Sequence, residues 1–156
     1  MVMPVSMHIS EQDLIRENLR STDKMLEWGR GGSTLEYSKY VADYYSIEHD
    51  KVWYDRVMAL KKDNVHYYLI PMSKEWHGES DGSYEQFKDY VDFPKTLGIK
   101  FDVVLVDGRC REGCLKSLLS FIDRDTKVFV HDRKRYTFDG YKVIKVLTSL
   151  AYLRKA

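Results

Sequence analysis

Three glycines stand close together near the start of the chain, in the run Glu27-Trp28-Gly29-Arg30-Gly31-Gly32-Ser33-Thr34. Glycine lets the backbone turn tightly and approach a ligand where a Cβ atom would collide. Such a loop between a strand and a helix is typical of sites for nucleotide-like cofactors, although an ordinary glycine-rich turn has the same composition. Gly29, Gly31, Ser33 and Thr34 are therefore candidate cofactor-binding residues.

A second candidate contact is Glu48, which ends the next predicted strand about 20 residues after the glycine loop. A carboxylate at this place can accept hydrogen bonds from both hydroxyls of an adenosine ribose. Asp50 is close enough to compete for the role, but it precedes a predicted helix and suits the N-cap position. The loop and Glu48 together predict a nucleoside cofactor.

The residues around the loop favour one nucleoside over another. The carboxylate of Glu27, just before the glycines, would repel a pyrophosphate, whereas S-adenosylmethionine carries an ammonium and a sulfonium and no phosphate. Thr34 stands where the third position of a dinucleotide fingerprint is Gly or Ala. Both features favour S-adenosylmethionine, with a nicotinamide-dependent oxidoreductase and a non-catalytic binding module as the alternatives.

Three polar side chains follow two later predicted strands: Asp107 ends the fourth strand, and His131 and Asp132 end the fifth. If the cofactor is S-adenosylmethionine, the transfer of its methyl group to a hydroxyl needs a general base, or a metal that lowers the pKa of the hydroxyl. We predict Asp107 and His131 as catalytic residues, and Asp107 and Asp132 as ligands of Mg²⁺ or another divalent cation. Capping and ion pairing with nearby arginines are the alternative roles.

Positive charge gathers at the same edge, at Arg109, Arg111 and Arg133, although the formal net charge of the chain is only +1. Arginine suits an anionic or hydroxyl-rich acceptor. Trp76 and Tyr84, in and beside the long loop after the third strand, add aromatic surface. We predict acceptor contacts at Arg109, Arg133, Trp76 and Tyr84, against a simple solvated rim and a loop packed on itself.

These candidate residues lie at the ends of strands in an alternating pattern. The apolar runs predict strands at residues 25–28, 44–47, 65–70, 101–108 and 127–131, with a final pair at 141–147 and 150–153. Helices are predicted at residues 10–20, 33–42, 51–60, 84–91 and 112–122, the first with Ser10 as N-cap. Five alternating strands indicate an α/β sheet with helices on both faces, and the closely spaced final pair indicates an antiparallel hairpin.

Length and composition fit a single domain of residues 1–156, with a helical extension at 1–24 and a core at 25–156. The near-neutral charge gives no argument for a nucleic-acid partner, and no apolar run is long enough to span a membrane. Two cysteines, Cys110 and Cys114, are expected to be free thiols. We expect a soluble protein that acts in the cytoplasm, or in a host's cytoplasm if a virus encodes it.

Three segments resemble class I S-adenosylmethionine-dependent methyltransferases: residues 26–34, 46–50 and 101–109. The likeness extends from about Met25 to the C-terminus. It implies a Rossmann-like, doubly wound, mostly parallel seven-stranded sheet with an antiparallel C-terminal hairpin. It also implies that Glu27, Gly29 and Gly31 surround the methionine moiety while Glu48 holds the ribose.

The chain departs from the family pattern at two places. Ser33 stands where many members have a third glycine, and the third strand is followed by Ile70-Pro71-Met72-Ser73, where many members have an acidic residue facing adenine. Backbone groups around Met72 are therefore our candidate adenine contact, with simple strand termination as the alternative.

The Val-Asp-Gly-Arg segment and the later His-Asp pair resemble small O-methyltransferases of glycan biosynthesis, including domains of glycan-building proteins of large DNA viruses. This resemblance implies a sugar or glycan hydroxyl as acceptor, such as one on a deoxyhexose. From the near-neutral charge we expect neither a nucleic-acid nor a membrane partner. The short segment before the first predicted strand suits an open site for a glycan end, or a chain that forms one domain of a larger glycan-synthesising protein.

Overall fold

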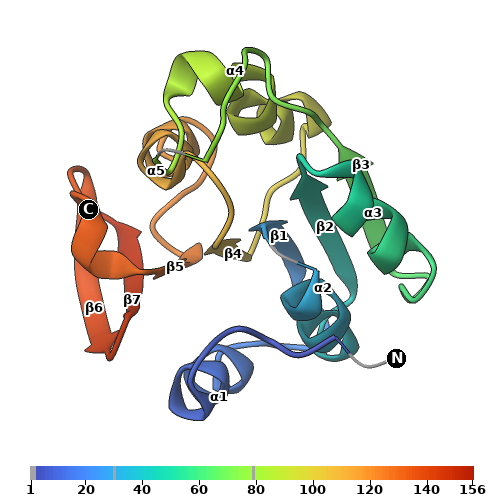
Figure 1. Cartoon of the computed structure of the whole chain (residues 1–156). Helices are drawn as coiled ribbons and strands as arrows, with labels where there is room; N and C mark the ends of the chain where they lie inside the picture. Colours follow the sequence, from blue (N-terminus) through green and yellow to red (C-terminus); the bar gives the residue numbers. More distant parts are fainter. Residues whose placement is uncertain (1–2, 30, 79) are drawn as a thin grey trace.

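The computed structural model describes residues 3–29, 31–78 and 80–156, and its strands form one seven-stranded sheet in the order β3-β2-β1-β4-β5-β7-β6 (Figure 1). The strands are β1 (Lys24–Trp28), β2 (Asp43–Glu48), β3 (Val65–Leu69), β4 (Val103–Val106), β5 (Lys127–His131), β6 (Tyr141–Leu147) and β7 (Leu150–Lys155). Strands β1 to β5 pair in parallel, and β7 pairs antiparallel with β5 and β6. The predicted mixed sheet and its C-terminal hairpin are confirmed.

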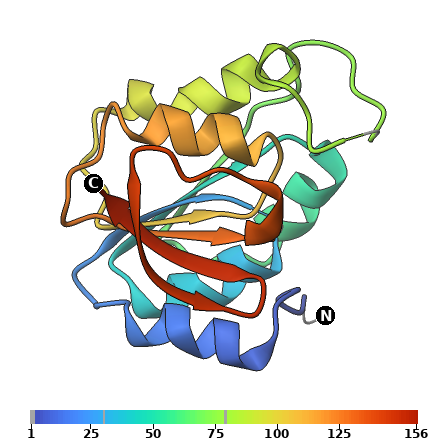
Figure 2. The same cartoon turned by 90° about the vertical axis from the view of Figure 1, so that its left-hand side faces the viewer.

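Helices cover both faces of this sheet. They are α1 (Ile9–Glu17), α2 (Gly32–Tyr37), α3 (Lys51–Met58), α4 (Tyr84–Asp92) and α5 (Arg111–Leu118), with 3₁₀ turns η1 (Ser38–Tyr40), η2 (Phe93–Leu97) and η3 (Arg133–Arg135). Figure 2 shows the C-terminal hairpin at the outer edge, with α1 on one side of the sheet and α4 and α5 on the other. Among the described helices, none is both long and apolar enough to cross a lipid bilayer.

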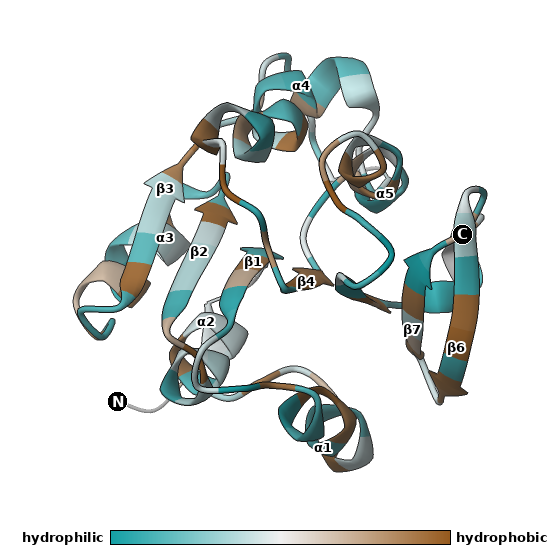
Figure 3. Cartoon of the chain, turned by 180° about the vertical axis from the view of Figure 1, so that it is seen from behind, coloured by the Kyte–Doolittle hydropathy of each residue, from teal (hydrophilic) through white to brown (hydrophobic). Residues whose placement is uncertain are grey.

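Alternation along the strands divides the core into two layers. In β4, Val103 and Leu105 pack with α1, α2 and α3, whereas Val104 and Val106 pack with α4 and α5. All four are buried, as expected of a central parallel strand, and β4 has the brown of hydrophobic residues in Figure 3. The same alternation decides which way the polar residues at the strand ends point.

Several helices end earlier than predicted, and the clearest differences are at α1 and α2. His8, and not Ser10, caps α1: its side chain accepts a hydrogen bond from the Ser10 amide, while the Glu11 carboxylate accepts one from the His8 amide. Reciprocal capping of this kind fixes the first residue of a helix. The predicted helix at residues 33–42 is also shorter, because α2 ends at Tyr37 and continues as η1.

Candidate functional site

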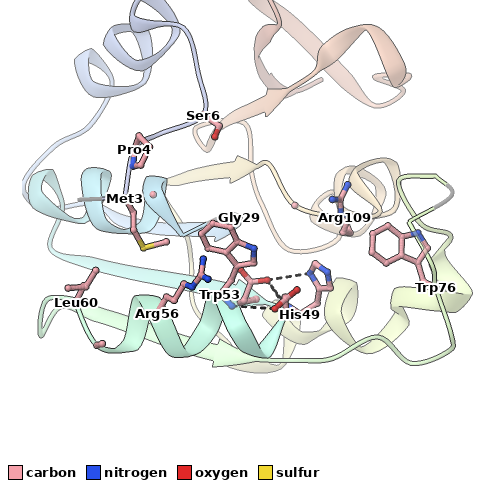
Figure 4. A pocket seen from close by; sticks show the side chains of 15 residues that line it. Met3, Pro4, Ser6, Gly29, His49, Trp53, Arg56, Leu60, Trp76 and Arg109 are labelled. Carbon is pink, nitrogen blue, oxygen red and sulfur yellow. Dashed lines mark hydrogen bonds and ion pairs between the residues drawn. The ribbon is translucent and has the colours of Figure 1, made fainter. Parts of the chain in front are cut away.

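A cavity of about 660 Å³ opens beside the carboxyl ends of β1, β2 and β4 (Figure 4). Strand order reverses between β1 and β4, and ligands of doubly wound sheets bind at such a switch point. The volume lies in the range of small-molecule and cofactor sites. The cavity is lined by Met3, Pro4, Ser6, Gly29, Gly32, Glu48, His49, Asp50, Trp53, Arg56, Ala59, Leu60, Trp76, Gly108 and Arg109.

Glu48, the last residue of β2, provides a fixed carboxylate at this cavity. It is only 2% exposed, and its Oε2 atom accepts hydrogen bonds from the amides of His49 at 2.9 Å and Asp50 at 3.0 Å. Asp50 is engaged elsewhere, because its carboxylate accepts hydrogen bonds from the amides of Val52 and Trp53 as the N-cap of α3. The predicted N-cap role of Asp50 is confirmed, and Glu48 remains the candidate for a pair of ribose hydroxyls.

Glu27 lies beneath the glycine loop and not on the cavity wall. It is fully buried and accepts hydrogen bonds from the hydroxyls of Ser33, Thr34, Tyr44 and Ser46. Burial raises the pKa of Glu27, and these four hydrogen bonds offset only part of the rise. The predicted contacts Glu27, Ser33 and Thr34 thus bind one another and hold the loop in shape.

The glycine loop is packed closely from both sides. A Cβ atom on Gly29 would lie 2.2 Å from the Glu27 Cδ atom, and one on Gly32 would lie 2.1 Å from the Pro4 carbonyl oxygen. Gly31 has a φ of +66°, a conformation that favours glycine. Gly29 and Gly32 line the cavity, and the N-terminal segment Met3–Ser6 covers the loop. Arg30 lies outside the described residues.

An aromatic and cationic group forms the wall beyond Glu48. The rings of His49 and Trp76 meet edge to face at 6.0 Å, and the Arg109 guanidinium lies 5.0 Å from the Trp76 ring centre. The indole Nε1 of Trp76 is buried and has no hydrogen-bond partner among the described residues. A buried donor of this kind suits a ligand that supplies an acceptor atom, such as a purine ring nitrogen.

The predicted catalytic residues Asp107 and His131 lie together beside the cavity, although neither lines it. The His131 Nδ1 atom is 3.3 Å from Asp107 Oδ1, and its Nε2 atom is 3.6 Å from Glu11 Oε1. Burial lowers the pKa of His131, but the contact with Asp107 and the charges of Asp132 and Glu11 outweigh it, so the net pKa is raised. A raised pKa favours the imidazolium form, which is a partner for Asp107 and a poor base.

The two carboxylates predicted to bind a divalent metal contact an arginine instead. The Arg111 Nη1 atom lies 3.5 Å from Asp107 Oδ1 and 3.0 Å from Asp132 Oδ2, and the Arg111 side chain is 1% exposed. Its guanidinium supplies the positive charge that a metal would bring. Residues 3–29, 31–78 and 80–156 hold no cluster of three His, Cys, Asp or Glu able to bind a metal. The geometry does not fit the predicted metal site, and Arg111 is not part of a solvated rim.

Three other predicted contacts lie away from this cavity. Tyr84 lines a second cavity of about 470 Å³ between α4 and α5, together with Cys110. The guanidinium of Arg133 donates a hydrogen bond to the Thr148 carbonyl at the β6–β7 turn. Met72 is 39% exposed and does not line the main cavity. Of the predicted acceptor contacts, the structure brings Trp76 and Arg109 together.

Several lining residues were not predicted from the sequence. His49 follows Glu48 directly, and its position alone could have marked it. Trp53 and Arg56 stand three residues apart on α3, a spacing that places them on one helix face. The segment Met3–Ser6 carried no usable signal, because nothing local to it indicates that it folds back over the glycine loop.

Comparisons with solved structures show that methyltransferases share this fold. A methyltransferase-like protein from Silicibacter pomeroyi superposes with a TM-score of 0.76 at 23% identity, over 99% of this chain and 90% of that one. An RNA methyltransferase from Salinibacter ruber, in complex with S-adenosyl-L-homocysteine, gives a TM-score of 0.63 at 14% identity, over 98% and 93% of the two chains. The chain has the fold of class I S-adenosylmethionine-dependent methyltransferases.

A third methyltransferase-fold neighbour is larger. The MycE methyltransferase of the mycinamycin biosynthetic pathway, in complex with Mg, S-adenosyl-L-homocysteine and mycinamycin VI, gives a TM-score of 0.61 at 14% identity. This match covers 94% of the present chain but only 45% of MycE. No protein-family model matches the sequence, and no curated protein sequence matches it either.

Proposed function

We propose that the chain is an S-adenosylmethionine-dependent O-methyltransferase that acts on a sugar or glycan hydroxyl, such as one on a deoxyhexose. The observation that carries the proposal is Glu48, a buried carboxylate fixed by two backbone amides at a cavity beside the switch point of a methyltransferase fold. Its position at the end of β2 suits it to hold the two ribose hydroxyls.

The glycine loop favours this cofactor over a dinucleotide. A dinucleotide pyrophosphate needs open amides at the start of the helix after the loop. Here that helix starts at Gly32, against which the Pro4 carbonyl is packed, and the Glu27 carboxylate lies below the loop. The Pro4 carbonyl presents an oxygen where a phosphate would need donors. S-adenosylmethionine carries no phosphate and supplies an electrophilic methyl group on a sulfonium.

Different residues of the cavity wall are assigned to different parts of the cofactor. Glu48 holds the ribose, and the group of His49, Trp76 and Arg109 receives the adenine. Gly29 and Gly32 leave room for the methionine half under Met3–Ser6. This arrangement directs the reactive methyl group toward the space beside Gly108, at the end of β4.

In the transfer step, the acceptor oxygen bonds to the methyl carbon while the carbon–sulfur bond breaks, and the electron pair of that bond stays on sulfur. The hydroxyl proton goes to Asp107, which precedes Gly108, and His131 is the positioning residue that holds Asp107. Asp107 also faces Arg111, and most of the acceleration comes from proximity and orientation. No step passes through a metal ion.

The sugar acceptor is supported by the likeness of the Val-Asp-Gly-Arg segment and the later His-Asp pair to glycan O-methyltransferases. Trp76 and Arg109, predicted from the sequence as acceptor contacts, are assigned here to the adenine instead. One neighbour is a methyltransferase bound to mycinamycin VI, and another is an RNA methyltransferase. Proteins of this fold therefore include some that bind a small molecule and some that act on RNA. We propose that the chain methylates glycans, either as a free-standing protein or as one domain of a larger glycan-synthesising protein.

The test is methyl transfer from labelled S-adenosylmethionine to deoxyhexose-containing glycans and to RNA, each with and without EDTA. We expect labelled glycan, no labelled RNA and no effect of EDTA, because Arg111 occupies the space between the two carboxylates. Asp107→Asn should lose most of the activity while binding cofactor normally. Transfer to RNA alone, or full activity of Asp107→Asn, would contradict the corresponding part of the proposal.

A further inference from the structure

The main cavity extends past the glycine loop into a second arm, between the N-terminal segment and α3. In Figure 4, the labelled side chains that line this arm, Met3, Pro4, Arg56 and Leu60, lie on the far side of Trp53 from Trp76. Its walls are mostly apolar: Met3, Pro4, Trp53, Ala59 and Leu60, with one cation, Arg56. The nucleoside assignments to Glu48 and Trp76 leave this arm unused.

Arg56 is available for a ligand in this arm. Its guanidinium lies 5.2 Å from the centre of the Trp53 ring, and no carboxylate of the described residues forms an ion pair with it. The other arginine of the cavity, Arg109, lies at the opposite end against Trp76 and is 3.9 Å from Asp81. An anionic group in the arm would therefore meet Arg56.

The arm also adjoins the loop at which the sulfur end of the cofactor is expected. A Cβ atom on Gly31 would lie 3.5 Å from the Trp53 ring and 2.9 Å from the Met3 side chain. The methionine tail of S-adenosylmethionine ends in an α-carboxylate and an α-ammonium. Glu27 cannot reach this tail, because it is fully buried by four hydroxyls. The α-carboxylate of this tail is the anionic group, and Arg56 is the cation of the arm that can bind it.

We propose that Arg56 binds the α-carboxylate of the methionine moiety and so acts as a positioning residue for methyl transfer. This inference rests on the proposed function, since it assumes the same cofactor. A guanidinium matches a carboxylate in two parallel hydrogen bonds, and the Trp53 face restricts the guanidinium to the arm. Anchoring the tail here and the ribose at Glu48 fixes the sulfur between two points.

The test compares two ligands that differ only in the tail. S-adenosylhomocysteine carries the amino-acid group, whereas 5′-methylthioadenosine has the same nucleoside and a sulfur but no carboxylate. In calorimetric titrations, we expect Arg56→Gln to weaken S-adenosylhomocysteine binding about tenfold or more, the usual size for a charge-assisted contact. Binding of 5′-methylthioadenosine should not change.

Matched variants separate the loss of the carboxylate contact from a general loss of positive charge or of nucleoside binding. Lys62→Gln removes the same charge from an exposed residue just after α3 and should leave both affinities unchanged. Arg109→Gln should weaken both ligands alike, because it acts on the nucleoside end. Arg56→Lys keeps the charge but loses the two parallel N–H donors of the guanidinium. Its affinity for S-adenosylhomocysteine should therefore lie between those of wild type and Arg56→Gln.

The outcomes are distinguishable. Equal loss of both ligands in Arg56→Gln, or no loss of either, would overturn the role of Arg56 while leaving the cofactor assignment intact. Wild-type protein that binds neither ligand would instead overturn the proposed function. If Arg56→Gln fails to fold, as judged by its thermal transition, Arg56→Lys decides: equal affinities to wild type for both ligands would overturn the inference.

Discussion

At the scale of single residues, two glutamates at neighbouring strand ends have different roles. Both Glu27 and Glu48 were predicted to contact the cofactor, but only Glu48 lines the cavity. The pairing register places Glu27 opposite Ser46, on the same side of the sheet as Tyr44. A reader of the sequence sees these hydroxyls 17 and 19 residues from Glu27 and cannot know that they converge. Burial of Glu27 therefore depends on register, which composition does not reveal.

The division of work between Glu48 and Asp50 gives the first prediction. Glu48→Gln should weaken S-adenosylhomocysteine binding about tenfold or more, because the amide keeps the shape but loses an acceptor for the ribose. Asp50→Ala should instead lower the free energy of unfolding by about 1 kcal/mol, the usual cost of a lost N-cap. Calorimetry and urea unfolding measure the two effects. The assignment is wrong if Asp50→Ala, once folded, loses affinity and Glu48→Gln does not.

His131 gives a prediction of pH dependence. Its pKa is raised above the ordinary value of 6.5, with Asp107, Asp132 and Glu11 facing it and Arg111 bound to two of these acids. A raised pKa in the folded state stabilises the protein fully below the unfolded value, and this stabilisation is lost as the pH rises through the folded value.

Wild type should therefore exceed His131→Gln in free energy of unfolding by more at about pH 6 than at about pH 9. Urea unfolding at the two pH values measures this difference. Glu11→Gln should reduce the pH dependence by removing one of the facing charges. A difference that stays constant or grows with pH would show that His131 is not held as an imidazolium.

At the scale of elements, the structure joins segments that the sequence keeps far apart. Helix α1 was predicted as an extension, yet its Glu11 is buried and accepts a hydrogen bond from the Ser149 amide at the β6–β7 turn. Glu11 also faces His131 at the end of β5. The helix could be predicted from its local pattern, but these contacts span more than half of the chain and follow only from the sheet order.

The junction after β4 gives a prediction at this scale. A Cβ atom on Gly108 would lie 2.0 Å from the Tyr90 hydroxyl of α4 and 3.2 Å from the backbone of Trp28. Gly108→Ala should therefore destabilise the fold by about 1–3 kcal/mol, as overpacking commonly does. Combining it with Tyr90→Phe should recover part of the loss in a double-mutant cycle of unfolding free energies. Strictly additive effects would mean that α4 and the β4 junction do not press on one another.

At the scale of the whole molecule, the mostly parallel sheet with its antiparallel C-terminal hairpin was predictable, because alternating strands and helices permit few arrangements of a doubly wound sheet. The site was predictable where it depends on strand ends, as at Glu48 and Gly29. It was not predictable where distant segments meet. The cover of Met3–Ser6 and the pairing of Asp107 and Asp132 with Arg111 both arise from tertiary packing.

The central claim is that this cavity binds S-adenosylmethionine and not a dinucleotide. The most direct measurement is isothermal titration of the purified chain with S-adenosylhomocysteine and, separately, with NAD⁺. We predict saturable binding of S-adenosylhomocysteine at one site and no binding of NAD⁺, because the Pro4 carbonyl presents an oxygen where a pyrophosphate would need donors. Binding of NAD⁺ in preference to S-adenosylhomocysteine, or binding of neither, would contradict the account.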